Sequence, residues 1–233
     1  MTQAILELRG VARDFVEAGK KVTALQKTDF SIKRGEFVAV VGPSGSGKST
    51  FLTIAGGLQN PSRGEVVVHG KDITELSVKE LSKVRLSEVG FILQASNLVP
   101  YLTIEKQLLL IDRVVRRESE SQASVMEGLF KDLGLTKLRK KYPSDLSGGE
   151  RQRAAIAKVL YGTSSLILAD EPTASLDTTK AFEVVKLLAR ETRERKKATI
   201  MVTHDERLLE YCDAVYEMSD GVLKKRRGHK RKA

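Results

Sequence analysis

The sequence predicts an α/β fold in which a mostly parallel sheet is interrupted by a lobe of helices. Two continuous apolar runs, Phe37–Val41 and residues 166–169, are typical of parallel strands that are buried on both faces. The first run leads into a glycine-rich loop, and the second ends in two carboxylates. Between them, much of residues 98–158 carries apolar side chains at helical spacing. These three observations predict a parallel core with a helical insertion.

Alternating and short apolar segments predict the remaining strands. Residues 5–8 and 27–32 alternate between apolar and polar side chains, as half-buried strands do. The other expected strands are short and lie at residues 66–68, 91–93, 199–202 and 214–218.

Helical spacing predicts the helices. One is expected over residues 48–58, directly after the glycine-rich loop, and another over about residues 150–161. The polar residues 116–124 would join two helices of the lobe. A further helix over about residues 179–196 has one apolar side that would face the sheet. The residues on that side are Val184, Val185, Leu187 and Leu188.

Length and composition limit the classes of protein that fit. The chain has 233 residues, of which 41% are hydrophobic and 30% charged, so one large domain with a substantial core is expected. No apolar run reaches the roughly 18 residues that a membrane-spanning helix needs, and the first ten residues lack the apolar stretch of a signal peptide. Cys212 is the single cysteine, which favours a cytosolic protein in which this residue is a small buried hydrophobe.

The chain is strongly basic, with a formal net charge of +10, and much of the excess lies in residues 224–227 and 230–232. One interpretation is a solvated, unstructured end. The alternative is contact with anionic lipid headgroups, to which each basic residue near the surface contributes about 1 kcal/mol. Nucleic acid is not expected as a partner, because only 5% of the residues are aromatic and no stacking motif accompanies the charges.

The sequence GPSGSGKST at residues 42–50 predicts a phosphate-binding loop between a strand and a helix. Its three glycines would let backbone N–H groups turn inward around phosphate oxygens. Lys48 would place a cation on the β- and γ-phosphates, and the Ser49 hydroxyl can ligate Mg²⁺. The residues of this loop that are expected to contact nucleotide are Gly42, Pro43, Ser44, Gly45, Ser46, Gly47, Lys48, Ser49 and Thr50.

Two carboxylates follow the apolar run at residues 166–169. Asp170 would lie at the carboxyl end of a buried strand, where α/β sheets bind ligands, and would hold Mg²⁺ through water. Glu171 would point toward the attacking water and act as its general base. Gln94 and His204 also follow expected strands, although each alone is more often an ordinary loop residue.

Residues 146–150 (LSGGE) immediately precede an expected helix. Ser147, Gly148 and Gly149 would therefore lie at a helix N-terminus, which is a natural anion site. The alternative is a flexible Ser-Gly-Gly turn that binds nothing.

Taken in order, these motifs resemble those of the ATP-binding subunits of ABC transporters over nearly the whole chain. Residues 42–50 are similar to the Walker A motif, and residues 166–171 to Walker B with its catalytic glutamate. Gln94 is similar to the glutamine of the Q-loop, residues 146–150 to the family signature, and His204 to the switch histidine.

The resemblance also implies roles for residues that no pattern singles out. Residues 175–177 resemble the D-loop, so that Asp177 is expected near the nucleotide. Phe15 falls where the family usually has a tyrosine that stacks on adenine, and phenylalanine retains the π face without the hydroxyl. The implied ligands are ATP and Mg²⁺, with the metal near Ser49, Gln94 and Asp170. The implied catalytic residues are Lys48, Gln94, Glu171 and His204.

The fold implied by the resemblance is a P-loop NTPase with a RecA-like parallel core and an N-terminal antiparallel β part. The core would comprise about residues 1–94 and 160–220, and the inserted helical subdomain about residues 95–159. Residues 221–233 would form a basic tail of this single ABC ATPase domain.

A second copy of the chain is the first partner that the resemblance implies. The two copies would pair head to tail, with ATP between the phosphate loop of one chain and Ser147–Gly149 of the other. The second partner would be an integral membrane permease, which the helical lobe would push. The chain would then lie peripherally on the cytoplasmic face of a bacterial cell membrane.

Within the family, GPSGSGKST and LADEPTASLD are similar to the MacB/LolD type of exporter ATPase. Residues 90–108 and 203–213 are similar to the ATPases of bacterial haem exporters, so haem efflux is the expected process. A non-transport ATPase of the FtsE type, which passes ATP-driven motion to a membrane partner, is the alternative. A DNA-repair type would need a long coiled-coil insertion, and a binding-only type would lack some of the catalytic residues.

Overall fold

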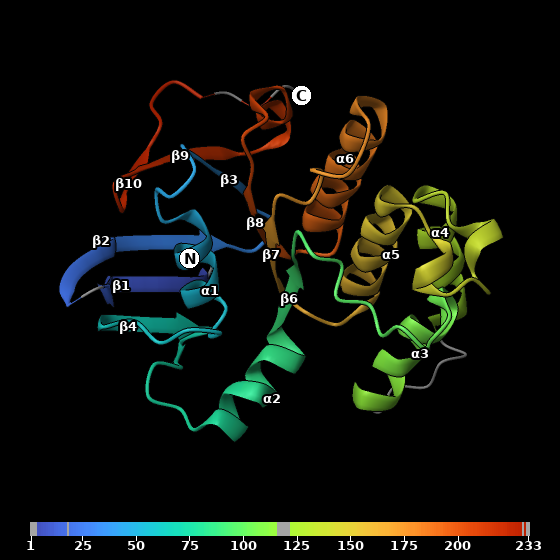
Figure 1. Ribbon diagram of the computed structural model, residues 1–233, viewed down its shortest axis with the longest axis horizontal. Coiled ribbons are helices and arrows are strands. Elements are labelled where there is room, and N and C mark those ends of the chain that lie inside the picture. The colour runs from blue at the N-terminus through green and yellow to red at the C-terminus, as the bar shows by residue number, and fades with distance from the viewer. Residues whose placement is uncertain (1–3, 18, 116–121, 230, 232–233) are drawn as a thin grey trace.

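The computed structural model describes residues 4–17, 19–115, 122–229 and 231. Within these residues it contains two sheets and a group of helices (Figure 1). The strands are β1 (Ala4–Glu17), β2 (Lys20–Lys33), β3 (Phe37–Val41), β4 (Arg63–Val68), β5 (Lys71–Asp72), β6 (Val89–Ile92), β7 (Leu166–Asp170), β8 (Ala198–Val202), β9 (Ala214–Ser219) and β10 (Val222–Lys225). The helices are α1 (Lys48–Ala55), α2 (Val78–Glu88), α3 (Ile104–Val115), α4 (Ala123–Asp132), α5 (Gly148–Tyr161) and α6 (Thr178–Glu194), with short 3₁₀ helices η2 (Thr136–Leu138), η3 (Pro143–Asp145) and η4 (Glu206–Tyr211).

The larger sheet has the strand order β10-β9-β3-β8-β7-β6, and its neighbours are parallel except for β9 and β10. β3 shows why its strands are apolar throughout. Phe37, Ala39 and Val41 belong to the core on one face of the sheet, and Val38 and Val40 to the core on the other, because successive side chains of a strand point to opposite faces. The mostly parallel α/β core predicted by the sequence is confirmed.

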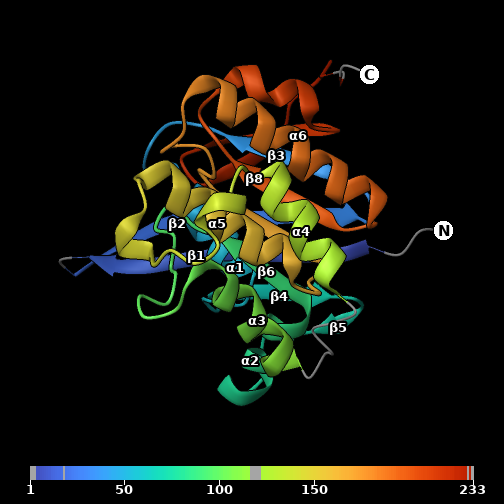
Figure 2. The same cartoon turned by 90° about the vertical axis from the view of Figure 1, so that its right-hand side faces the viewer.

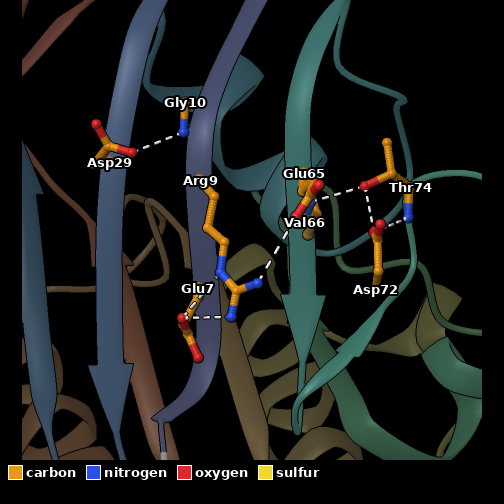
Figure 3. Close-up of polar contacts among 8 residues, drawn as sticks. All are labelled: Glu7, Arg9, Gly10, Asp29, Glu65, Val66, Asp72 and Thr74. Atoms are coloured by element: carbon orange, nitrogen blue, oxygen red, sulfur yellow. Dashed lines mark hydrogen bonds and ion pairs between the residues drawn. The ribbon is translucent and has the colours of Figure 1, made fainter.

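The smaller sheet has the order β2-β1-β4-β5 and is antiparallel throughout. On β1, Leu6 and Leu8 are buried, whereas Arg9 is exposed on the outer face. There Arg9 forms ion pairs with Glu7 at 3.0 Å and Glu65 at 3.7 Å (Figure 3). Exposed ion pairs contribute little to stability, so the buried apolar face is what holds this sheet on the protein.

A small polar network closes the edge of this sheet after β5. The Val66 amide donates to Thr74 Oγ1 at 2.8 Å, and the Thr74 hydroxyl and amide both donate to Asp72 Oδ1, at 2.6 and 2.8 Å (Figure 3). These bonds from Thr74 lower the pKa of the Asp72 carboxyl. The edge strand β5 is therefore tied back to β4 beyond its two ladder pairs.

α1 is packed between the two sheets, where it contacts β1 and β2 on one side and β7 and β8 on the other. The opposite face of the larger sheet is covered by α5 and α6 (Figure 1). The apolar side of α6 is buried as expected, at Val184, Val185, Leu187 and Leu188. Within the described parts of the chain, no helix combines the length and apolarity needed to cross a membrane.

The inserted lobe is built on α5, against which α3 and α4 pack (Figure 2). α4 packs in the same core as α5, where three of its side chains are buried: Met126, Leu129 and Phe130. The segment expected to link two helices at residues 116–124 is shorter than predicted, because α4 begins at Ala123; residues 116–121 lie outside the described residues.

Some element boundaries differ from the sequence-based expectation. α2 was not predicted, because Leu81 is its single buried side chain and the helix shows no clear apolar side. It begins at a capping box between Ser77 and Glu80 instead. β6 ends at Ile92, so Gln94 lies in the following loop, and α1 ends at Ala55, before two glycines rather than at residue 58.

The basic C-terminal segment is folded onto the sheet. Residues 222–225 form β10, and Arg226 contacts Glu217 at 2.6 Å and Glu206 at 2.9 Å. Arg231 contacts Asp213 at 2.7 Å. The interpretation of an unstructured end is therefore wrong for the described residues of this segment, where backbone pairing and carboxylates hold the chain, although Lys224, Lys225 and Arg227 remain exposed to solvent.

Cys212 is buried beneath this segment, as the sequence suggested. The ring of His229 lies with Nε2 2.9 Å from the Cys212 carbonyl oxygen. Burial raises the pKa of the Cys212 thiol to about 12, so the thiol stays protonated and unreactive in the folded protein.

Candidate nucleotide site

The carboxyl ends of the parallel strands border a pocket of about 520 Å³. The phosphate loop follows β3, Asp170 ends β7, and the loops after β6 and β8 supply Gln94 and His204. This edge is where open α/β sheets bind ligands. The expected site residues that line the pocket are Gly42, Ser44, Gly45, Gly47, Lys48, Ser49, Thr50, Gln94, Asp170, Glu171 and His204.

Lys48 begins α1 and folds its side chain back over the phosphate loop. Its Nζ donates to the carbonyl oxygens of Gly42 at 2.8 Å and Pro43 at 2.6 Å. The N-terminal turn of α1 opens toward the same space, so the helix dipole and the ammonium add their positive potential at one point. The arrangement suits a group with several anionic oxygens.

The loop is packed tightly against neighbouring backbone. A Cβ atom on Gly42 would lie 2.1 Å from the Met218 carbonyl oxygen, and one on Gly47 would lie 2.3 Å from the Ala24 carbonyl oxygen. Both glycines also have positive φ, of 151° and 104°. Only glycine fits these two positions, because any side chain would push the loop off its support.

Ser46 is buried in the loop, and its Oγ has no hydrogen-bond partner among the described residues. An unpaired buried hydroxyl carries a desolvation cost. Ser46 does not line the pocket, so the fit to a phosphate group rests on the glycine cradle and Lys48.

Ser49 and Asp170 bring two oxygen ligands together. Ser49 Oγ donates to Asp170 Oδ2 at 2.9 Å across the gap between α1 and β7. A hydroxyl and a carboxylate at this separation form part of the oxygen set that Mg²⁺ takes when phosphates and water supply the rest. The donor set therefore fits Mg²⁺ rather than a metal that prefers nitrogen or sulfur.

Glu171 and His204 form the other side of the pocket. His204 Nδ1 donates to Glu171 Oε2 at 3.0 Å, and the Glu171 amide donates to the Val202 carbonyl at 3.1 Å. Glu171 has a φ of 48°, a left-handed conformation that is uncommon for a residue with a side chain. The Glu171 carboxylate bonds to His204 whereas the Asp170 carboxylate bonds to Ser49, so the two adjacent acids have different surroundings.

Several expected site residues lie outside this pocket. The Phe15 ring is on β1, with the Arg13 guanidinium 4.7 Å from its centroid. Asp177 caps α6 by accepting from the Lys180 amide at 2.9 Å. Pro43 and Ser46 belong to the loop without lining the pocket.

The LSGGE segment also lies outside the pocket of its own chain. Ser147 is the N-cap of α5 and forms a reciprocal capping box with Glu150, whose pKa is lowered by the bond from the Ser147 amide. A Cβ atom on Gly149 would lie 3.0 Å from the Ser175 carbonyl oxygen. Ser147 and Gly148 remain exposed, so this helix start is available to another molecule.

The structure adds residues that the sequence did not indicate. The pocket is also lined by Ala24, Ala174 and Val202. The turn between β9 and β10 supports the phosphate loop through a backbone hydrogen bond. There the Gly221 amide donates to the Ser46 carbonyl at 3.0 Å. No sequence pattern could reveal these contacts, because they use backbone atoms or small apolar side chains.

The fold and the pocket define a P-loop nucleotide-binding domain with an inserted helical lobe. The family model described as ABC transporter matches residues 25–174, and the chain belongs to this family. It is an ATP hydrolase of the ABC type.

Curated relatives match nearly the whole chain. A protein of Staphylococcus haemolyticus is 40% identical over 221 residues, covering 94% of this chain and 98% of the relative. One of Staphylococcus epidermidis is 42% identical over 220 residues with the same coverage. Both are named putative hemin import ATP-binding protein HrtA.

Solved structures agree with the fold. A dimeric ATP-binding cassette in a post-hydrolysis state with ADP and Pi matches with a TM-score of 0.88 and 33% identity, covering 96% of this chain and 100% of that one. CbiO1 of Clostridium perfringens, described as part of the ABC transporter complex CbiONQ, matches with a TM-score of 0.81 and 29% identity. It covers 95% of this chain and 87% of that one.

The close packing of Gly42 generates a testable prediction. Gly42→Ala should lower the affinity for a fluorescent ATP analogue at least tenfold, because the added Cβ would meet the Met218 carbonyl oxygen at 2.1 Å and displace the loop. Gly128→Ala is the matched control, since its Cβ on α4 would meet no atom within 4 Å. Equal nucleotide affinity in the two variants would contradict the packing argument.

Proposed function

We propose that this chain is the ATP-hydrolysing subunit of a membrane transporter that moves haem out of the cell. The observation that carries the ATPase part is the pocket in which Lys48, Ser49, Asp170, Glu171 and His204 meet at one edge of the sheet. The names of the staphylococcal relatives, which refer to hemin, support haem as the cargo.

ATP and Mg²⁺ would bind to groups that are hydrogen-bonded to one another in this structure. The phosphates would take over the Lys48 ammonium from the Gly42 and Pro43 carbonyl oxygens, which are weaker partners than an anion. Ser49, Asp170 and Gln94, which line the same pocket, would hold Mg²⁺. Bound there, Mg²⁺ would neutralise charge that develops on the phosphate oxygens. Phe15 would stack on the adenine base.

Glu171 would act as the general base for the attacking water. Its carboxylate lies 3.0 Å from His204 Nδ1, and the Glu171 side chain is 19% exposed, so it can accept a proton from water at the mouth of the pocket. His204, which is 75% exposed, would turn from Glu171 to the γ-phosphate. Asp170 would remain a ligand of the metal, so that the two adjacent acids would have different roles.

A second copy of the chain would complete the site. Ser147, Gly148 and Gly149 lie outside the pocket of their own chain and expose a helix N-terminus. A head-to-tail pair would bring this anion site over the γ-phosphate held by the partner's phosphate loop. Asp177, two residues after Ser175, would lie in the same interface. The dimeric cassette with ADP and Pi supports this proposal by analogy.

The membrane partner would be a separate permease, reached from the cytoplasmic face through the helical lobe. Closure around ATP would move the lobe, and hydrolysis would release it, because the signature contacts exist in the closed state alone. The relatives are named for the import of hemin, which favours transport over an FtsE-like role without cargo. Residues 95–159 remain the proposed lobe, although α5 reaches Tyr161.

Lipid contact through the basic end stays a prediction. Arg226 and Arg231 are paired with carboxylates, whereas Lys224, Lys225 and Arg227 are exposed. Liposome sedimentation of the Lys224→Gln/Lys225→Gln chain would test it, with unchanged binding to anionic lipid as the negative result. Deleting residues 224–233 is less informative, because it would also remove part of β10.

Glu171→Gln should reduce ATP turnover at least a hundredfold while an ATP-bound dimer still forms, because the amide keeps the shape but cannot accept the proton. Phosphate release and size-exclusion chromatography measure the two effects. Glu183→Gln, on the exposed side of α6, is the control and should hydrolyse ATP normally. Near-normal turnover in Glu171→Gln would overturn the general-base assignment.

Mixing two inactive variants tests whether the site is shared between chains. Lys48→Ala and Gly148→Asp chains should each fail to hydrolyse ATP, and their mixture should recover measurable activity. One of the two ATP sites in the mixed dimer would combine an intact Lys48 with an intact Gly148 from the other chain. A mixture as inactive as its components, with mixed dimers shown by affinity pull-down, would contradict a composite site.

The cargo and the direction of transport need a cellular test, since the relatives are named for import whereas we propose export. Deleting the gene for this chain should make cells accumulate hemin and stop growing at lower hemin concentration. The wild-type gene should restore both, and Glu171→Gln should restore neither. Reduced hemin uptake after deletion would make the direction wrong, and unchanged hemin content would make the cargo wrong.

A further inference from the structure

A second pocket, of about 470 Å³, lies at the opposite edge of the parallel sheet from the nucleotide pocket. Its walls are the turn that leads from β2 to β3, the β4–β5 hairpin, and the last turns of α2, which leads directly into β6 (Figure 1). Glu88 at its wall immediately precedes β6, whereas Gln94 at the nucleotide pocket follows β6. The two pockets are therefore separate sites that lie at opposite ends of β6.

Three side chains from different elements hold this pocket in shape. His69 Nε2 lies 2.6 Å from Ser165 Oγ and 3.1 Å from Glu88 Oε2, and Ser165 Oγ donates to Glu88 Oε2 at 2.9 Å. His69 sits in the β4–β5 turn with a φ of 50°. The cluster joins this turn to the end of α2 and to the start of β7, so the pocket exists before a ligand binds.

Three cations line the pocket, and their side chains have no hydrogen-bonded or ion-paired partner among the described residues. Arg34, Lys71 and Lys83 come from the β2–β3 turn, β5 and α2, and all three are exposed. Across the described ranges, none of these side chains forms a hydrogen bond or an ion pair. These three positive charges repel one another, and solvent or a bound anion would offset that repulsion.

The nearby carboxylates form hydrogen bonds with side chains other than these three cations. Glu88 is held by His69 and Ser165, and Asp72 by Thr74. Glu80 accepts bonds from Ser77, which lower the pKa of its carboxyl, with a smaller effect from the charges of Lys71 and Lys83. These hydrogen bonds do not remove the charges of the carboxylates, but Glu88 is the one carboxylate that lines the pocket, against three cations, so the described lining carries an excess of positive charge.

The floor of the pocket is apolar. Val68 and Ile73 are each 3% exposed, and Val84 of α2 is partly buried beside them. A bare inorganic anion would gain nothing from this floor, whereas a molecule with an apolar body would bury surface on it. The volume lies in the range of small-molecule sites.

We propose that this pocket, lined by Arg34, Lys71 and Lys83 over an apolar floor, binds an organic anion that has an apolar body and at least two negative charges. Haem, an apolar macrocycle with two carboxylates, has this chemistry. The choice of haem as ligand rests on the proposed function, and occupancy here would let the ATPase respond to its own cargo. β6 and β7 would connect the pocket to Gln94 and Asp170.

The test uses hemin as the probe on the full chain saturated with ADP and Mg²⁺, with binding followed by the Soret absorbance. Hemin should bind at least about tenfold more tightly than hemin dimethyl ester, in which both carboxylates are neutral. The Arg34→Gln/Lys71→Gln/Lys83→Gln chain should lose at least about tenfold in hemin affinity and keep its affinity for the ester.

The matched control removes three exposed cations outside the pocket, through Lys79→Gln, Lys106→Gln and Lys137→Gln. It should bind hemin as the unaltered chain does, and both triple variants should bind ATP normally. Equal binding of hemin and its ester, or equal losses in the two triple variants, would overturn the proposal. Displacement of hemin by micromolar pyrophosphate would overturn the requirement for an apolar body. The cellular experiment above reports cargo independently, so either proposal can fail without the other.

Discussion

The site depends on one constraint, the close approach of the phosphate loop to the backbone beneath it. Gly42 meets the carbonyl of Met218, and Gly47 meets that of Ala24, at distances that leave no room for a side chain. Ala24 belongs to the antiparallel sheet and Met218 to β9, so the loop is clamped between the two sheets. Rigid support of this kind is what lets backbone N–H groups stay preorganised for an anion.

The same constraint explains why the C-terminal segment is folded. The turn between β9 and β10 supports the loop through the Gly221 amide, and that turn is held in place by the pairing of the two strands. Arg226 adds contacts to Glu206 and Glu217, which fix the chain close to His204. Charges that look like a free basic end in the sequence thus help to position the nucleotide pocket.

The parallel sheet separates two kinds of chemistry at its two edges. The carboxyl edge gathers the phosphate loop, Asp170, Glu171 and His204. The amino edge carries the cationic pocket around Arg34. Because β6 and β7 are short and run between the edges, a change in the position of α2 has a short path to Gln94. Such coupling requires two discrete arrangements of these elements, which the hemin experiment would begin to test.

The sequence alone was sufficient for the fold class and for most of the residues that line the pocket at the carboxyl ends of the parallel strands, whose roles remain predictions. Continuous apolar strands such as Phe37–Val41 report burial on both faces, and the loop at residues 42–50 carries its chemistry in adjacent residues. These features are local, so their residue types and spacing identify them. α2 could not be predicted in the same way, because it buries little and relies on its capping box.

Contacts between distant residues were decided by the packing of the chain. The pairing of Glu171 with His204, the support of the loop by Met218 and Gly221, and the cluster of His69, Ser165 and Glu88 each join separate elements. The sequence marks none of the supporting residues, because a backbone carbonyl or amide is the same in every residue type. The LSGGE segment combines a local and a tertiary feature. Its motif is evident in the sequence, but its position outside the pocket of its own chain follows from where α5 packs.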